Sequence, residues 1–546
     1  MFKFVNVRFA YRANGKGYTV TSAESVSNAR LSLDIKENTE TFGVTVRSKS
    51  EIEIMKIAAE FEYDFLPDDR IFLNGYQSWT DSAELGIDGR VRGIGHIPAA
   101  VREKYAFSAY GDYTFAKYSL RKGHFHGFSY GYVKHSDGIF DFIGSLGENT
   151  GFTMIRVNTE KNTVTVEKDC RGLNISGDYE GLSLYLGSGK EDEVFDAYFV
   201  WLGIAPTAEK PVFGYTSWYR HYQDINERCI LNDLEGLKEC DAKADIFQID
   251  DGYQTAVGDW LSIDMSKFPD GMKPAADRIK EEGLTPGLWL APFVCEEKSE
   301  LFSEHPDWLL RDENGEPVRA GSNWSGAYAL DIYNEQFREY LKEVFRTVID
   351  DWGFGLLKLD FLYAACIIPR RDKTRGMVMA DGMDLLRELA GAAKILGCGV
   401  PIASAFGKVD YCRIGTDVTP EWNDKPYMQL MHRERPSTRN SIINSVFRRQ
   451  LSGRAFINDP DVFMLRDTDT TMSTDQRRCL AEINALCGGV LFTSDDMGEY
   501  GEEQKKLLDD MLRLRDARIL AAEYSDGRLI VSAELEGRSV IKIFDM

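Results

Sequence analysis

From Val212 onward the chain alternates between strand-like and helical segments, and this rhythm constrains the fold more than any other feature. Short apolar runs are each followed by a helical pattern or a long loop. Eight such repeats over roughly 300 residues match the size of a (β/α)8 barrel. A doubly wound open sheet is the alternative, but no G-x-G-x-x-G or Walker sequence follows any run. The predicted strands are Val212–Trp218, Ile246–Asp251, Pro286–Phe293, Gly355–Tyr363, Pro401–Phe406, Arg413–Val418, Ala455–Leu465 and Gly489–Ser494.

The residues before this barrel pattern predict a different architecture. Residues 1–205 contain many short segments of alternating apolar and polar residues separated by turns, which is typical of a β-sandwich. We therefore expect a sandwich over 1–205, a catalytic barrel over 206–515 and a short C-terminal β segment over 516–546. One loop of the sandwich, Asn74–Trp79, is rich in aromatic and polar residues. Trp79 either stacks on a ligand or closes the edge of the sandwich.

Composition excludes several classes of partner. The formal charge of −22 on 546 residues argues against nucleic acids and anionic membranes. No apolar run is long enough to span a bilayer, and the N-terminus does not resemble a signal peptide. Nine cysteines, Cys240 among them, are scattered without paired spacing, which predicts reduced thiols and a cytoplasmic location. With only seven histidines and no C-x-x-C sequence, we expect no metal site.

The predicted strand Gly355–Tyr363 holds two charged residues in an otherwise apolar run. Lys358 and Asp360 are two positions apart, so both side chains point to the same side of the strand. A buried charge must be paired or functional. The pair is either a structural salt bridge or a reactive carboxylate that a cation keeps ionised.

Polar and aromatic residues gather at the predicted strand ends, where a barrel places its active site. Three explanations compete: a divalent cation site, solvated loop starts, or a glycosidase with two catalytic carboxyls and acceptors for sugar hydroxyls. The abundance of aromatic residues favours sugar, because ring faces pack on the C–H faces of sugars. The candidate residues are Trp218, Asp250, Asp251, Trp289, Lys358, Asp360, Ser404, Gly407, Lys408, Arg413 and Asp417.

Glycoside hydrolysis requires two carboxyls in different protonation states. Asp360 shares its strand face with Lys358, which lowers a carboxyl pKa and suits a nucleophile. Asp417 lies two predicted strands later among small and apolar residues, which suits the raised pKa of a general acid. Arg413 on the same face opposes that shift unless it points elsewhere.

These residues resemble glycoside hydrolase family 36, the α-galactosidase or melibiase family, from about residue 213 to 496. The resemblance rests on the order and spacing of several short sequences. They are Asp250-Asp-Gly-Tyr253, Gly258-Asp-Trp260, Lys267-Phe-Pro-Asp-Gly271, Gly287-Leu-Trp289, His305-Pro-Asp-Trp308 and Leu357-Lys-Leu-Asp360.

The resemblance implies a role for each matching residue. Asp360 would be the nucleophile and Asp417 the general acid/base of a retaining mechanism. Asp250 and Asp251 would accept hydrogen bonds from the O4 and O6 hydroxyls of galactose. Lys358 would bind a neighbouring hydroxyl, and Trp289 would line the sugar pocket. Family members often form oligomers in which a neighbour's sandwich loop completes the site, which makes a homo-oligomer an expectation and Trp79 its candidate residue.

The chain departs from the family pattern at three places. Ala403–Lys408 stands where the family has a Cys-Ser-Gly-Gly-type loop near the sugar O2. The family commonly has an arginine just before the Leu-Asp step that matches Leu330–Asp331, but the preceding residues Ser325–Ala329 include none. The C-terminal β-domain of longer members is reduced to a short tail. We expect a retaining α-galactosidase that needs no metal or organic cofactor. The alternatives are an α-N-acetylgalactosaminidase, another α-glycosidase or transglycosylase, a non-catalytic sugar-binding protein, and a metal-dependent hydrolase.

Overall fold

The N-terminal part folds as a 13-stranded antiparallel sheet that wraps around an apolar core. The structure is a computed structural model and describes residues 1–238, 242–370, 372–525 and 527–546; Cys240 lies outside these residues. The 22-residue strand β5 pairs with β1, β4, β12 and β13, and so joins the layers. The strands are β1 Lys3–Ala13, β2 Lys16–Ser22, β3 Val26–Ser27, β4 Leu31–Glu37, β5 Thr41–Glu62, β6 Arg70–Leu73, β7 Leu85–Gly86, β8 His124–Phe128, β9 Tyr130–Lys134, β10 Phe140–Ser145, β11 Thr153–Asn158, β12 Thr163–Lys168 and β13 Asn174–Gly189.

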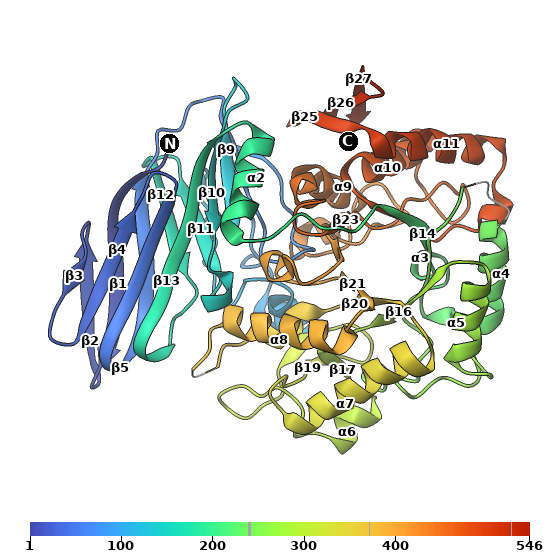
Figure 1. The fold of residues 1–546 in the computed structure, drawn as a ribbon, viewed down its shortest axis with the longest axis horizontal. Helices are drawn as coiled ribbons and strands as arrows, with labels where there is room; N and C mark the ends of the chain where they lie inside the picture. Colours follow the sequence, from blue (N-terminus) through green and yellow to red (C-terminus); the bar gives the residue numbers. More distant parts are fainter. Residues whose placement is uncertain (239–241, 371, 526) are drawn as a thin grey trace.

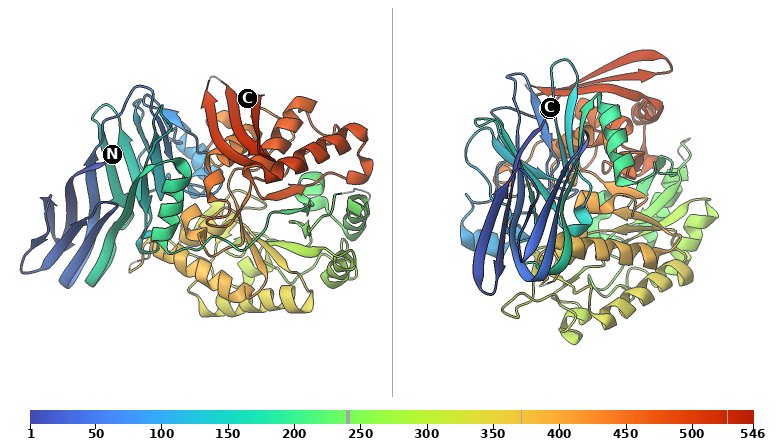
Figure 2. Two further views of the ribbon diagram at one scale, coloured as in Figure 1. Left: turned by 45° about the horizontal axis from the view of Figure 1, so that its top comes forward. Right: turned by 60° about the vertical axis from the view of Figure 1, so that its left-hand side comes forward.

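Helix α2 (Glu191–Leu202) covers the side of this sheet that faces the rest of the chain (Figures 1 and 2). Phe195 of α2 packs its ring edge-on against Phe142 and Tyr130, with ring centroids 5.0 and 5.8 Å apart. Gly203 ends the helix with φ of 68°, a left-handed conformation that glycine adopts without strain. The chain then enters the barrel, so the apolar face of the sheet becomes continuous with the barrel core.

The central part is a closed barrel of eight parallel strands. The hydrogen-bonded order runs β23-β22-β21-β20-β16-β15-β14-β24, and a parallel bridge between Phe463 and Thr493 brings the ends together. The predicted fold class is confirmed. The strands are β14 Val212–Thr216, β15 Ile246–Ile249, β16 Thr285–Leu290, β20 Leu356–Leu359, β21 Lys394–Gly397, β22 Tyr411–Arg413, β23 Ile457–Asp459 and β24 Val490–Thr493.

The fifth strand lies earlier in the chain than predicted. Helix α8 (Arg375–Ala390) is capped by Gly391, and Lys394–Gly397 then forms β21, whereas the predicted strand was Pro401–Phe406. Residues 402–405 instead form one turn of 3-10 helix. Periodicity alone does not separate a short buried strand from the end of a buried helix, which explains the error.

Amphipathic helices cover the barrel. In α7 the buried residues Phe337, Leu341, Val344 and Phe345 recur at helical spacing and face the strands. The Asn334 side chain caps the helix by accepting a hydrogen bond from the Phe337 amide. The longer helices are α4 Glu227–Lys238, α5 Met272–Glu281, α7 Glu335–Arg346, α8 Arg375–Ala390, α9 Thr438–Phe447, α10 Thr474–Cys487 and α11 Glu502–Arg513.

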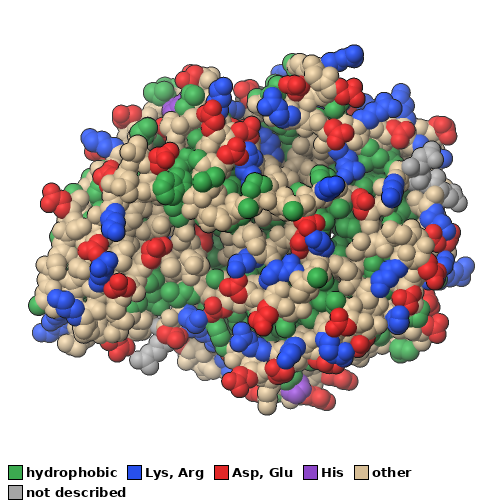
Figure 3. Space-filling model, viewed as in Figure 1, with side chains coloured by type: hydrophobic (Ala, Val, Ile, Leu, Met, Phe, Trp, Pro, Cys, Tyr) green, Lys and Arg blue, Asp and Glu red, His purple; other side chains and the backbone are tan. Residues whose placement is uncertain are grey.

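The last residues form a small antiparallel sheet on the outside of the barrel. Its strands are β25 (Arg518–Ser525), β26 (Arg528–Leu535) and β27 (Arg538–Asp545), and they lie beside α10 (Figure 2). Lys542 binds Glu482 of α10 at 2.8 Å. On the face drawn in Figure 3, acidic and basic side chains are interspersed. Across the described residues, every helix is too short or too polar to cross a bilayer.

Candidate active site

A cavity of about 330 Å³ opens at the C-terminal ends of the barrel strands. Such a volume is at the lower end of the range for small-molecule sites, and its walls combine carboxylates with aromatic rings. Seven of the predicted residues line it, together with Trp79 from the N-terminal part. The lining residues are Trp79, Tyr110, Trp218, Gln223, Asp250, Asp251, Trp289, Asn323, Trp324, Lys358, Asp360, Phe361, Asp417, His432, Glu434 and Pro436.

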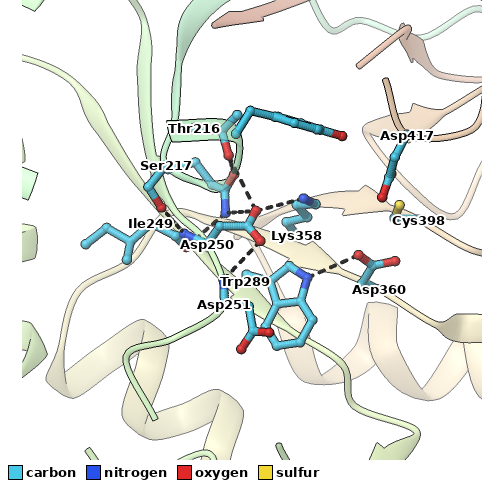
Figure 4. Close-up of polar contacts among 12 residues, drawn as sticks. Thr216, Ser217, Ile249, Asp250, Asp251, Trp289, Lys358, Asp360, Cys398 and Asp417 are labelled. Atoms are coloured by element: carbon cyan, nitrogen blue, oxygen red, sulfur yellow. Dashed lines mark hydrogen bonds and ion pairs between the residues drawn. The ribbon is translucent and has the colours of Figure 1, made fainter. Parts of the chain in front are cut away.

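Asp360 lies immediately after β20 and is held by two donors. The Trp289 indole Nε1 donates to one carboxylate oxygen at 3.1 Å (Figure 4). The Phe361 amide donates to the other oxygen at 2.9 Å. Phe361 has φ of 54°, a strained conformation for a non-glycine residue. Burial raises the pKa of Asp360, the Lys358 charge opposes the rise, and the Asp417 charge adds to it. The predicted lowering of this pKa was therefore wrong, because desolvation outweighs the cation.

Lys358 forms its closest ion pair with Asp250 and not with Asp360. The ammonium lies 2.7 Å from the Asp250 carboxylate, and both side chains are buried. Burial opposes the ammonium form, but the neighbouring acidic groups, Asp250 foremost and Asp360 next, together outweigh it and raise the pKa of Lys358. Gln248 and the Asp251 amide also donate to Asp250, at 3.1 and 2.9 Å. These contacts thus hold the Asp250 side chain in a fixed orientation at the cavity wall.

Asp251 is the second residue after β15 and lines the same cavity as Asp250. Its carboxylate accepts from the Gln223 amide and from the Trp324 indole, both at 2.9 Å. Burial raises the pKa of Asp251, and the neighbouring Asp250 charge acts in the same direction. Neither Gln223 nor Trp324 follows a predicted strand end, so the sequence pattern did not predict them as site residues. Trp324 could have been noted only as an aromatic residue close to the site motifs in the sequence.

Asp417 faces the region of Asp360 from the loop after β22 (Figure 4). Its side chain is 39% exposed, and Arg413 donates to it at 2.7 Å. The other nitrogens of Arg413 bind Asp459 and Asp461, at 3.2 and 2.9 Å. The predicted apolar surroundings of Asp417 are therefore wrong: Arg413 points at it from behind the cavity wall and does not itself line the cavity.

Three residues that were predicted to bind substrate do not line the cavity. Ser404 lies in the misassigned strand, Gly407 and Lys408 follow it, and all three are absent from the cavity wall. Lys408 forms an ion pair with Asp384, and Gly407 lies beside Ile204. The residue that follows the true fifth strand is Cys398, whose thiol is buried next to Asp360.

Trp79 lines the cavity of its own chain. Its indole nitrogen donates to the Cys398 sulfur at 3.2 Å, and its ring packs edge-on against Phe361 at 5.1 Å. Trp79 thus contributes to the site without a neighbouring subunit, contrary to the expectation that a partner's loop supplies it. The loop is held down by Arg448, which is fully buried.

Arg448 fixes the loop by binding its backbone and side chains. Its guanidinium donates to the Ser78 carbonyl at 2.6 Å, to Asn74 at 2.9 Å and to Ser82 at 2.9 Å. It also donates to the Ile414 carbonyl in the barrel at 2.8 Å. One side chain therefore joins the sandwich loop to the barrel rim.

Several cavity residues carry no signal in the sequence. Tyr110, Asn323, His432 and Glu434 come from long loops, and only the fold brings them to the strand ends. The Tyr110 and His432 rings stack with centroids 4.7 Å apart. Within the described part of the chain, no cluster of three His, Cys, Asp or Glu side chains is suited to bind a metal ion.

Comparison with known proteins gives consistent matches. Residues 205–375 match the Melibiase family model. A solved structure of TtGalA, the α-galactosidase from Thermus thermophilus in complex with p-nitrophenyl α-D-galactopyranoside, is 28% identical, has a TM-score of 0.73, and the match covers 99% of this chain and 98% of that one.

Relatives with longer chains match over a smaller part. The chain is 30% identical to α-galactosidase AgaA of Geobacillus stearothermophilus over 159 residues, which cover 28% of this chain and 21% of AgaA. It is 31% identical over 143 residues to the A type blood α-D-galactosamine galactosaminidase of Flavonifractor plautii, covering 25% of this chain and 13% of that protein. The chain thus spans about a fifth or less of the length of these relatives. The Melibiase match and the full-length structural match show that the chain is similar to α-galactosidases of the Melibiase family.

Proposed function

We propose that the protein is a retaining glycoside hydrolase that removes terminal α-linked galactose from oligosaccharides or glycoconjugates. One observation carries the proposal: Asp360 and Asp417 line the same cavity as the Asp250–Asp251 pair. The first two supply the chemistry of a double displacement, and the second two supply acceptors for hydroxyls. The full-length similarity to TtGalA, whose structure holds an α-galactoside, supports galactose as the sugar.

In this mechanism Asp360 is the nucleophile. One of its carboxylate oxygens attacks the anomeric carbon while Asp417 gives its proton to the leaving glycosidic oxygen, which releases the aglycone and forms a covalent glycosyl-enzyme. Asp417, now ionised, takes a proton from water, and the resulting hydroxide attacks the same carbon and frees Asp360. Arg413 holds Asp417 in position throughout, and the indole of Trp289 orients Asp360.

The sugar-binding wall is built for hydroxyl groups. Asp250 and Asp251 are acceptors, and the ammonium of Lys358 has donors left after it binds Asp250. The indole rings of Trp79 and Trp289 offer apolar faces to the sugar ring. Trp218 contributes a further aromatic surface at the cavity edge.

The test is turnover of para-nitrophenyl α-galactoside by wild-type protein and by Asp360→Ala. We expect wild-type turnover, none by the variant, and rescue of the variant by azide to give β-galactosyl azide. Asp384→Asn, an exposed carboxylate outside the cavity, is the matched control and should retain full activity. Substantial activity of Asp360→Ala without azide contradicts the nucleophile assignment.

The specificity alternative is α-N-acetylgalactosamine. It is favoured by the 31% identity to the galactosaminidase of Flavonifractor plautii over 143 residues. Parallel assays on the galactoside and the N-acetylgalactosaminide separate the two sugars, and product analysis with an added galactoside acceptor separates hydrolysis from transglycosylation. Sugar binding without turnover of any α-glycoside would instead indicate a non-catalytic protein.

We further propose a cytoplasmic location for the protein. Eight cysteines in the described residues are free thiols, and all except Cys229 are buried, as is usual in a reducing compartment. Cell fractionation with an antibody to the protein tests the location. Light scattering tests the proposed homo-oligomer, which the Trp79 contact does not require.

A further inference from the structure

A second cavity, of about 320 Å³, lies between the N-terminal sheet and the barrel. Its walls come from the loop after β7, from β8 and from the segment that leads into α9. Its volume is close to that of the candidate active site, so it can hold a ligand of about monosaccharide size.

Four arginines converge on this cavity, although the chain carries a formal charge of −22. Arg433 and Arg435 already bind Asp81 and Asp424, at 2.6 and 2.7 Å. Arg90 and Arg92 are exposed at the wall and have no ion-pair partner in the described part of the chain. Two guanidinium groups are therefore available to an anion, and their planar donor geometry suits a phosphate.

The floor of the cavity contains an unused hydrogen-bond donor. Asn444 is 1% exposed, and its side-chain oxygen accepts from the Ser82 amide at 2.7 Å. Its Nδ2 group has no hydrogen-bond partner among the described residues, and the same is true of Nδ2 of Asn440. A buried donor without a partner is destabilising, so the site favours a ligand that brings acceptors.

We propose that this cavity binds a phosphorylated monosaccharide. Arg90 and Arg92 would bind the phosphate at the rim, and the amides of Asn440 and Asn444 would donate to sugar oxygens. The wall residue Phe125 offers an apolar surface to the sugar ring. The assignment does not depend on the reaction at the other cavity.

One backbone segment separates the two cavities. His432, Glu434 and Pro436 line the candidate active site, whereas the intervening Arg433 and Arg435 line the second cavity. A ligand that contacts the arginines therefore constrains the segment that carries the active-site residues. We expect occupancy to change the KM for an α-galactoside, and this consequence alone rests on the proposed function.

Calorimetry on the full-length protein at 150 mM salt tests the site with three probes: glucose 6-phosphate, glucose and inorganic phosphate. We expect glucose 6-phosphate to bind more tightly than either of the others. Arg90→Ala/Arg92→Ala should weaken it about tenfold or more, since each lost charge-assisted contact is worth over 1 kcal/mol. Arg8→Ala/Arg338→Ala, which removes two exposed arginines elsewhere, is the matched control and should bind like the wild type.

Each other result overturns part or all of the proposal. No binding of glucose 6-phosphate, or equal weakening by both double variants, eliminates the site. Equal affinity for phosphate and glucose 6-phosphate eliminates the sugar part. Asn444→Ala, which removes the unpaired donor, should weaken the sugar phosphate more than inorganic phosphate. Calorimetry needs no turnover, so failure of the proposed hydrolase activity leaves this test intact; an unchanged KM despite binding eliminates only the coupling.

Discussion

Lys358 Nζ lies 2.7 Å from Asp250 Oδ2, so the cation of strand β20 pairs across the intervening strand β16 with the end of β15. The Lys–x–Asp pattern suggested a partner two residues away on the same strand. The barrel instead gives each carboxylate its own partner, because Trp289 of β16 donates to Asp360. The two aspartates are thereby held separately, one by a charge and one by neutral donors.

Replacing Lys358 with Met should destabilise the protein and remove activity. The Asp250 carboxylate would be left buried without its cation, and breaking such a pair costs about 3–5 kcal/mol. Denaturant unfolding and turnover of the galactoside measure the two effects. The double variant Lys358→Met/Asp250→Asn removes both charges and should regain much of the stability but no activity. A single variant as stable as the wild type contradicts the buried pair.

Trp289→Phe should move the acid limb of the pH–rate profile to higher pH. The indole hydrogen bond lowers the pKa of Asp360, against the rise that burial causes. Without it the carboxyl ionises at a higher pH, and the nucleophile must be ionised to react. The measurement is kcat/KM as a function of pH, with Trp308→Phe as the control because Trp308 lies outside the cavity wall. A shift of the acid limb to lower pH would show that the indole hydrogen bond raises the pKa of Asp360 and does not lower it.

Asp360→Asn should raise thermal stability at neutral pH while it abolishes turnover. The folded protein raises the pKa of this carboxyl above its unfolded value, so its contribution to stability is present at low pH. That contribution is lost as the pH rises through the folded pKa, and an amide avoids this loss. Tm measured at pH 4 and pH 7 should show a larger gain at pH 7. An equal or larger gain at pH 4 contradicts the linkage.

The sequence predicted best those site residues that carry a charge within a buried, apolar strand. Asp360 was predicted because a charged residue in a buried apolar strand must be paired or functional. The alternation of strands and helices predicts a barrel, which places its active site at the C-terminal ends of the strands. The partner of Lys358 depends on strand order across the barrel, which local pattern does not contain. Cys398 was missed because the short strand Lys394–Gly397 follows helix α8 too closely for the local pattern to separate the two. His432 reaches the cavity through a loop without periodicity.

Arg413→Lys should lower kcat more than it raises KM. Arg413 binds Asp417, Asp459 and Asp461 with separate nitrogens, and a lysine ammonium cannot reproduce that fork. Asp417 would lose its orientation, and a misplaced acid/base costs about tenfold or more in rate. Steady-state kinetics measure the split between kcat and KM.

The acidic partners of Arg413 give a second prediction, which concerns pH. Burial raises the pKa of Asp461 to about 6, the Arg413 charge opposes the rise, and the Asp417 charge adds to it. Protonation of Asp461 near that pH removes one of the charges that Arg413 binds. Asp461→Asn should therefore flatten any pH dependence of kcat near pH 6. An unaltered pH profile would show that Asp461 does not affect the position of Asp417.

Trp79→Ala should raise KM for the galactoside, whereas Lys408→Ala should leave it unchanged. Trp79 lines the cavity and donates to Cys398, but Lys408 binds Asp384 away from it. Loss of one aromatic face costs about 1 kcal/mol or more, which corresponds to a KM rise of about fivefold or more. Mixing Trp79→Ala with Asp360→Ala protein tests whether the tryptophan acts within its own chain. A chain-local Trp79 gives no recovery of the wild-type KM in the mixture, whereas recovery would show that a partner subunit supplies the ring.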